Sequence, residues 1–279
     1  MAFLLFLLVA SKNMGHANEF EHVLNHSSGR KISKIQICGE RCSGTNFIEY
    51  LLLKNIHNIS STMEFGQKHF LWWYGAPIDQ KRLENFVYSS YVSDPYNLTN
   101  SEDCLFVVVI RDPYDWLRSF FAQPWHVHRS LLNKGFFHFI RKTWKPADDI
   151  SITQFKHIDV VIDGVNPWSG LLFSNVLELR RWKNLNYLKL GTLVDNYVIA
   201  KYEDIKNDPE GFVDFVAANY NIEKPDTFFP IKKFKGSAWK KYKEKQYPQI
   251  SKTDIEFINA NIDWDIEGVF GYQPRKKVK

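Results

Sequence analysis

The chain has 279 residues, which suits one large domain or two small ones, and its 44% hydrophobic and 16% aromatic content is enough for a sizeable core. The net charge is +5, and four of the last five residues are basic, so the body is close to neutral and gives no case for nucleic-acid binding. Three cysteines, Cys38, Cys42 and Cys104, do not make a disulfide framework, and without a second cysteine pair we expect no zinc site.

The N-terminus carries an apolar run, residues 2–10, that is too short to span a bilayer, which needs about 20 residues. The run fits the apolar part of a signal peptide, although no positive residues precede it, and it equally fits a buried N-terminal segment. We divide the chain into a possible hydrophobic leader (1–18), one domain (19–273) and a basic tail (274–279). Both the secretory pathway with the Golgi lumen and the cytoplasm stay open, and membrane association is expected only if the run is an anchor.

A phosphate-binding loop is indicated between the first predicted strand, residues 31–39, and a helix with apolar residues at helical spacing. Gly39 and Gly44 have the spacing of a P-loop, but Thr45 and Asn46 follow in place of Lys and Ser or Thr. Backbone N–H groups at a helix N-terminus favour an anion. The sequence therefore predicts a phosphate cradle that lacks the lysine for a nucleotide's γ-phosphate.

A second strand-turn-helix unit follows. The continuous apolar run 104–110 predicts a strand buried on both faces, as in a parallel sheet. Asp112 as cap and Pro113 in the first turn predict a helix over 114–121.

Two residues of this unit are candidate ligands of a phosphate, Arg111 at the strand end and Ser119 eight residues later. A competing interpretation is that Arg111 pairs with Asp112 or Asp115 and that Ser119 is a small buried residue. Both interpretations stay open.

The later elements repeat the alternation. A third strand is predicted over 197–205, a helix after Asp208, and another after Ser251, which begins a capping box. The segment 171–185 is expected to be helical, and 157–164 to be a strand or a loop insertion. Strands that alternate with helices predict an α/β fold with a central parallel sheet and helices on both faces.

Several of these stretches resemble a known family. "ERCSGTN" after the first strand, "VIRDPYDWLRSFF" after the second, "KYEDIKNDPEGFVDFVAANYNI" and "KFKGSAWKKY" near the end are similar to the sulfotransferases that use the sulfate donor PAPS. The family's second signature has Arg, then Pro, then Ser eight residues after the Arg, which Arg111, Pro113 and Ser119 match. The resemblance runs from about residue 31 to 272 and implies a three-layer P-loop-like fold.

The resemblance also implies the ligand and its contacts. PAPS would be the donor substrate, with no metal. The 5′-phosphosulfate and the 3′-phosphate would be held by Arg41, Cys42, Ser43, Gly44, Thr45, Asn46, Arg111, Ser119, Lys235 and Gly236. Many members have Lys directly before Ser-Gly-Thr, where this chain has Cys42, so Arg41 or Lys68 would take over that catalytic role.

The acceptor hydroxyl needs a base, and His69 is the first candidate, with Lys68 beside it to stabilise the leaving oxygen. The alternative is a surface His-Lys pair, and Glu64 is the second candidate base. Glu203 is expected to brace the loops at the strand ends.

Aromatic and histidine residues are candidates for the site that binds the acceptor. Trp72, Trp73 and Trp125 would line an acceptor pocket or belong to the core. His126 and His128 are a metal-binding pair or, with no third ligand in sight, an acceptor-loop or surface pair.

The predicted function is transfer of a sulfuryl group from PAPS to a hydroxyl or amine. A saccharide, a protein tyrosine and a small metabolite all stay open as the acceptor. One alternative is a P-loop small-molecule kinase, which would carry a carboxylate for Mg²⁺ at the second strand end, where Arg111 stands. The other is a catalytically inactive homologue that binds PAPS or PAP.

Overall fold

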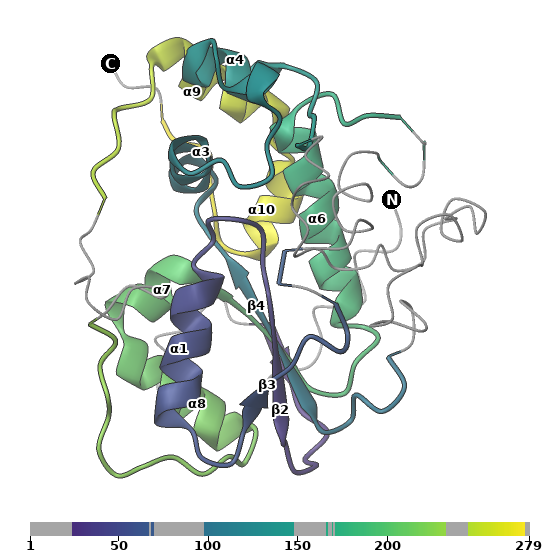
Figure 1. Cartoon of the computed structure of the whole chain (residues 1–279), viewed down its shortest axis with the longest axis vertical. Helices are drawn as coiled ribbons and strands as arrows, with labels where there is room; N and C mark the ends of the chain where they lie inside the picture. Colours follow the sequence, from purple (N-terminus) through teal and green to yellow (C-terminus); the bar gives the residue numbers. More distant parts are fainter. Residues whose placement is uncertain are drawn as a thin grey trace.

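A computed structural model describes residues 24–66, 68–69, 98–147, 166, 169, 171–232 and 245–276. A sheet with strand order β1-β5-β4-β2-β3 runs through this part of the chain (Figure 1). Its strands are β1 (Leu24–His26), β2 (Lys34–Cys38), β3 (Ser60–Ser61), β4 (Cys104–Ile110) and β5 (Tyr197–Lys201).

The fold is α/β, but the sheet is mixed. Strands β3, β2, β4 and β5 are parallel to their neighbours, whereas β1 lies antiparallel to β5 at the edge. The expectation of a wholly parallel sheet is therefore wrong at this edge. Antiparallel edge strands are common on otherwise parallel sheets, and a three-residue strand carries too short a pattern to be predicted.

Strand β4 forms the centre of the sheet. It pairs with β2 on one side and with β5 on the other, and all of its residues are buried. Its side chains alternate between the two faces, so that Val107 belongs to one buried cluster and Phe106 to another. A strand covered on both faces is apolar at nearly every position, which explains the continuous apolar run of residues 104–110.

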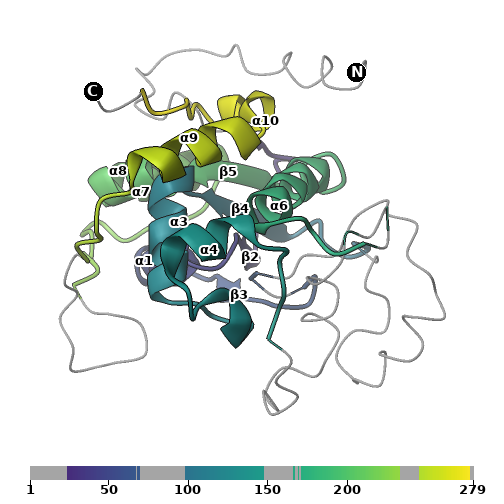
Figure 2. The ribbon, with the colours of Figure 1, turned by 90° about the horizontal axis from the view of Figure 1, so that it is seen from above.

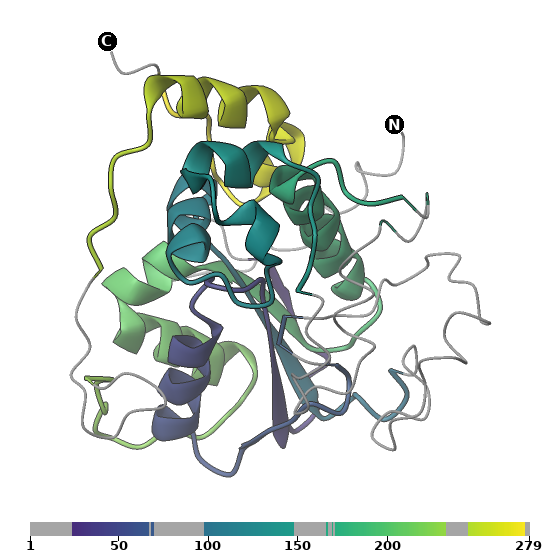
Figure 3. The same ribbon diagram turned by 45° about the horizontal axis from the view of Figure 1, so that its top comes forward.

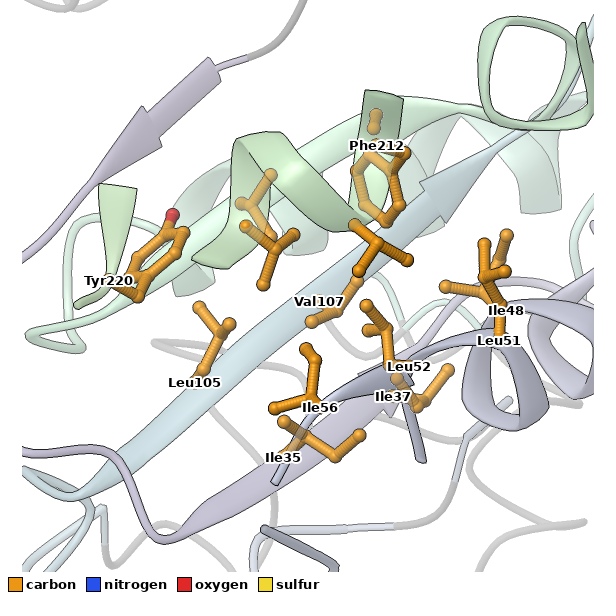
Figure 4. Close-up of a cluster of buried hydrophobic side chains, with 14 of the residues drawn as sticks. Ile35, Ile37, Ile48, Leu51, Leu52, Ile56, Leu105, Val107, Phe212 and Tyr220 are labelled. Carbon is orange, nitrogen blue, oxygen red and sulfur yellow. The ribbon is translucent and has the colours of Figure 1, made fainter. Parts of the chain in front are cut away.

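Helices pack on each face of the sheet. On one face, the cluster in Figure 4 joins Ile48 and Leu52 of one helix and Phe212 of another to Val107. On the other face, Tyr187 and Ile266 pack against the remaining strand residues. The helices on the first face are α1 (Thr45–Asn55), α7 (Tyr202–Asn207) and α8 (Pro209–Asn219). Those on the second face are α6 (Val176–Leu190) and α10 (Trp264–Val269), and Figure 1 shows both groups.

A third apolar cluster lies beyond the carboxyl ends of the strands, and Figures 2 and 3 show its helices close together. Trp116, Phe120, Phe139 and Trp144 are fully buried in it. It is built from part of α6 and from α3 (Pro113–Ala122), η1 (Arg129–Leu131), α4 (Gly135–Arg141) and α9 (Lys252–Asn261).

Side-chain caps fix most helix starts. Asp112, Asp208 and Ser251 each accept a hydrogen bond from a backbone N–H of the first turn, which confirms the three predicted caps. Two element boundaries differ from those predicted from the sequence. The third strand ends at Lys201 rather than at residue 205, because α7 begins directly after it, and α6 begins only after its own cap, Asn175.

Among the described residues, no helix combines the length and the apolar character that crossing a bilayer requires. The segment 157–164 and the leader, 1–18, lie outside the described residues.

Candidate functional site

The loop from Gly39 to Asn46 joins β2 to α1, so it lies between a strand and a helix N-terminus as predicted. Gly44 has a φ of +96°, and a Cβ there would lie 2.3 Å from the ring of Tyr202. Gly39 has a φ of +154°, and a Cβ there would lie 2.7 Å from the carbonyl oxygen of Val109. Both positions require glycine, because the backbone passes too close to its neighbours for any side chain.

Helix α1 begins at this loop. The helix has 11 residues, its cap is Gly44, which supplies no side-chain hydrogen bond, and its first turn has no acidic residue. Ser43 and Thr45 are buried, and the N–H of Ser43 donates to the backbone oxygen of Glu40 at 3.1 Å. Such an end favours a bound anion.

Arg111 connects the two strand-turn-helix units. Its Nη1 donates to the carbonyl oxygen of Cys42 at 2.9 Å, and its guanidinium lies 4.9 Å from the centre of the Tyr202 ring. Among the described residues, the buried Nε of Arg111 has no hydrogen-bond partner. Asp112 and Asp115 were the alternative partners that the sequence suggested for Arg111. Their carboxylates instead accept hydrogen bonds from Arg275, at 3.0 Å each.

Cys42 lies between the two units, with Ser119 beside it. The Cys42 thiol donates to the carbonyl oxygen of Gln123 at 3.4 Å. Burial raises the pKa of this thiol to about 11, while a hydrogen bond with Ser119 and the charge of Arg111 act in the opposite direction. Ser119 is buried and its hydroxyl accepts from the hydroxyl of Tyr247 at 3.0 Å. The structure thus brings Cys42, Arg111 and Ser119 together.

Arg41 faces the third apolar cluster. Its side chain is 1% exposed, and its guanidinium lies 5.3 Å from the centre of the Phe120 ring and 5.5 Å from that of Trp144. Its Nε is 3.1 Å from the carboxylate of Glu40. The expectation that Arg41 offers its forked donors to a phosphosulfate does not fit this placement, because the rings enclose the guanidinium.

Lys68 reaches the N-terminus of α1 instead. Its Nζ donates to Oδ1 of Asn46 at 3.2 Å and forms an ion pair with Glu49. Its backbone oxygen accepts from the N–H of Gly39 at 2.8 Å, so the segment is fixed against the loop. Burial lowers the pKa of Lys68 to about 8 despite the carboxylate. Of the two candidates for the missing lysine, Lys68 is the one whose ammonium contacts a side chain at the start of α1.

His69 is held on the other side of the same glycine. Its Nδ1 lies 2.8 Å from the carbonyl oxygen of Gly39, and since a carbonyl only accepts, Nδ1 carries the proton and Nε2 is the acceptor. Burial lowers the pKa of His69 to about 3, so the ring is neutral near pH 7. Glu64, the second candidate base, has an exposed carboxylate paired with Lys34 at 3.1 Å.

A pocket of about 260 Å³, lined by Gln123, Pro124 and Trp125, adjoins the loop through the Cys42–Gln123 hydrogen bond. Trp125 is 63% exposed, which agrees with a pocket-lining role and not with the core. Within the described residues, no group of three or more His, Cys, Asp or Glu side chains could hold a metal ion. Trp72, Trp73, Lys235 and Gly236 lie outside the described residues.

Glu203 braces the two strand ends, as expected. Its carboxylate accepts from the backbone N–H of Asp112 at 3.0 Å and from the hydroxyl of Tyr272 at 2.8 Å. Burial raises the pKa of Glu203.

Three residues at this site were not predicted from the sequence. Tyr202 packs against Gly44 and Arg111, and no local pattern indicates it. Lys183 is fully buried and its Nζ donates to the backbone oxygen of His69 at 3.0 Å; its spacing of four from Tyr187 on the buried face of α6 was an available signal. Arg275, assigned to the basic tail, docks on α3 instead.

No family model matches the chain. Among curated proteins, the mitochondrial intermediate peptidase of Scheffersomyces stipitis is 28% identical over 123 residues. The match covers 41% of this chain and 13% of the peptidase. A similarity of this extent assigns no family.

Proposed function

We propose that the protein is a PAPS-dependent sulfotransferase with a three-layer P-loop-like fold, and that it transfers a sulfuryl group to a hydroxyl or amine. The observation that carries the proposal is the contact of Arg111 with the carbonyl oxygen of Cys42 at 2.9 Å. It joins two anion-attracting strand ends into one site, and the buried Nε of Arg111 has no partner among the described residues. A donor with two separate anionic groups suits such a site.

The residues present fit this donor. PAPS supplies the activated sulfuryl group when bound. The backbone N–H groups at the start of α1 and the ammonium of Lys68 would neutralise the 5′-phosphosulfate. Arg111 and Ser119 would hold the 3′-phosphate, for which a guanidinium offers forked donors.

The neutral ring of His69 would serve as the acceptor of a hydrogen bond from the incoming hydroxyl, through Nε2. A pKa of about 3 makes the ring a weak base in the form described. Its fixed orientation supports a role in placing the hydroxyl in line with the sulfuryl group.

The kinase alternative has less support. The carboxylate nearest the second strand end, that of Asp112, accepts from the backbone N–H groups of Tyr114 and Asp115 and from Arg275. A carboxylate engaged in this way is a poor candidate for a Mg²⁺ ligand.

Thermal unfolding with PAP in EDTA, or with Mg·ATP, tests the proposal. We expect PAP at 100 times its Kd to stabilise the fold by about 2.7 kcal/mol, and Mg·ATP to have no effect. Arg111→Ala should weaken PAP binding by at least about 30-fold, because it removes a charge-assisted contact. Arg30→Ala, which removes an exposed arginine before β2, is the matched control.

Stabilisation by Mg·ATP alone would favour the kinase. PAP binding without turnover of labelled PAPS on a broad acceptor panel would favour the inactive homologue.

A further inference from the structure

Helix α6 buries several polar side chains, two of them cationic. Arg180, Lys183, Asn184 and Asn186 are each between 0% and 3% exposed. Burial of a charged group is costly unless the group is well hydrogen-bonded. The two cations, Arg180 and Lys183, lie three residues apart and therefore on the same side of the helix. Their partners show what this buried side of α6 holds.

Each of the two cations binds the backbone of a residue of the proposed site. Nη2 of Arg180 donates to the backbone oxygen of Arg111 at 2.8 Å, directly after β4. Nζ of Lys183 donates to the backbone oxygen of His69 at 3.0 Å. Hydrogen bonds from a charged donor are stronger than those between neutral groups. Helix α6 thus holds both the proposed ligand of the donor's 3′-phosphate and the histidine proposed to meet the acceptor.

His69 is held at its backbone by Lys183 and at its ring by Gly39. Its Nδ1 lies 2.8 Å from the carbonyl oxygen of Gly39, while the N–H of Gly39 donates to the oxygen of Lys68 at 2.8 Å. The pair of residues 68–69 is therefore fixed both to the loop and to α6. If the backbone oxygen of His69 were released from Lys183, the ring would shift, and its bond to Gly39 would weaken as the geometry is lost.

The ammonium of Lys68 has anchors of its own. Its Nζ donates to Oδ1 of Asn46 at 3.2 Å and forms an ion pair with Glu49, so that it is tied to α1. Loss of Lys183 should therefore displace His69 and leave the donor side of the site in place.

We propose that Lys183 is a positioning residue, which acts through the backbone oxygen of His69 to hold the imidazole where it meets the incoming hydroxyl. The inference rests on the proposed function. The competing interpretation is that Lys183 only stabilises the fold, which predicts no selective effect on His69.

The ring nitrogens of His69 report its position without any substrate. Long-range proton–nitrogen NMR spectra of the isotope-labelled protein distinguish the Nδ1–H tautomer from the Nε2–H tautomer. We expect Nδ1–H in the unmodified protein, because the carbonyl oxygen of Gly39 only accepts. Lys183→Met should lose this preference, whereas Lys189→Met, the same substitution at an exposed position of the same helix, should keep it. An unchanged tautomer in Lys183→Met would overturn the proposal.

Turnover of labelled PAPS on the acceptor panel measures the consequence. Lys183→Met should lower kcat by about tenfold or more and change the Kd of PAP by less than about twofold, because only the acceptor side moves. In the His69→Gln background, Lys183→Met should lower kcat no further, since both changes act through one imidazole. Equal losses of kcat in the two backgrounds would favour the purely structural role.

Lys183→Gln is the second variant if Lys183→Met does not fold. Its amide keeps a donor but ends one bond short of the lysine ammonium, so it should shift the tautomer in the same direction. Full retention of Nδ1–H in this variant would contradict the proposal. If the unmodified protein neither binds PAP nor turns over PAPS, the sulfotransferase is refuted, and the tautomer still decides whether Lys183 positions His69.

Discussion

In the proposed mechanism, Lys68 is the residue on which sulfuryl transfer depends most. Its ammonium lies at the start of α1, and burial lowers its pKa to about 8, so the charge is present below that pH and is lost above it. We expect kcat to fall as the pH rises through about 8. Lys68→Arg should move this decline to much higher pH, since a guanidinium keeps its charge, and Lys68→Met should lower kcat by about 100-fold or more at neutral pH. An alkaline limb that stays in place in Lys68→Arg would show that another group titrates there.

The buried neutral ring of His69 should make the free energy of unfolding depend on pH. Its pKa is lowered to about 3 in the folded protein, against 6.5 for an unperturbed histidine, so between these values the unfolded chain binds a proton that the folded one does not. The free energy of unfolding should therefore fall as the pH falls through this window, by at most about 1.4 kcal/mol for each pH unit.

Urea unfolding at pH 7, 6 and 5 measures this dependence. His69→Gln should flatten it, and His57→Gln, at an exposed position, should not. Equal slopes in the two variants would contradict the buried neutral ring.

At the scale of elements, the junction between β2 and α1 depends on Gly44. An alanine there adds a strained φ and a Cβ 2.3 Å from the Tyr202 ring, whereas at Gly29 the φ of +74° is also positive but no atom lies within 4 Å. We expect Gly29→Ala to lower the free energy of unfolding by about 1 kcal/mol, from backbone strain alone. Gly44→Ala should cost about 2–5 kcal/mol and should also weaken PAP binding, because Tyr202 must move away from Arg111. Urea unfolding of both variants measures the difference, and equal losses would mean that the contact with Tyr202 is unimportant.

Elements that depend on local chemistry were predictable from the sequence. Each of these elements depends on a few neighbouring residues. The structure confirms the predicted caps at Asp112, Asp208 and Ser251 and the predicted strand over 104–110. The direction of Arg41 was not predictable, because the rings that enclose it come from residues that are distant in the sequence.

At the scale of the molecule, a buried ion pair ties the second helical face to the site. Arg180 of α6 donates to both carboxylate oxygens of Glu267 in α10, at 2.6 and 2.8 Å, and its Nη2 also donates to the backbone oxygen of Arg111. Both side chains are 3% exposed. The pair could not be predicted from the sequence, because its partners are 87 residues apart.

Removing one partner should leave a buried charge. We expect Glu267→Leu to lower the free energy of unfolding by about 3–5 kcal/mol, and Arg180→Met/Glu267→Leu to recover much of that loss. A double-mutant cycle by urea unfolding measures the coupling. A double variant less stable than the single one would show that Arg180 matters through its bond to Arg111 rather than through Glu267.

We propose that Arg111 and the start of α1 form one site for a donor with two anionic groups. A crystal structure of the protein with PAP would show whether they do. We predict that the 5′-phosphate lies on the backbone N–H groups of residues 44–46, with the 3′-phosphate on the Nε of Arg111 and the hydroxyl of Ser119. A nucleotide bound elsewhere, or one that leaves Arg111 without contact, would contradict this placement of the donor site.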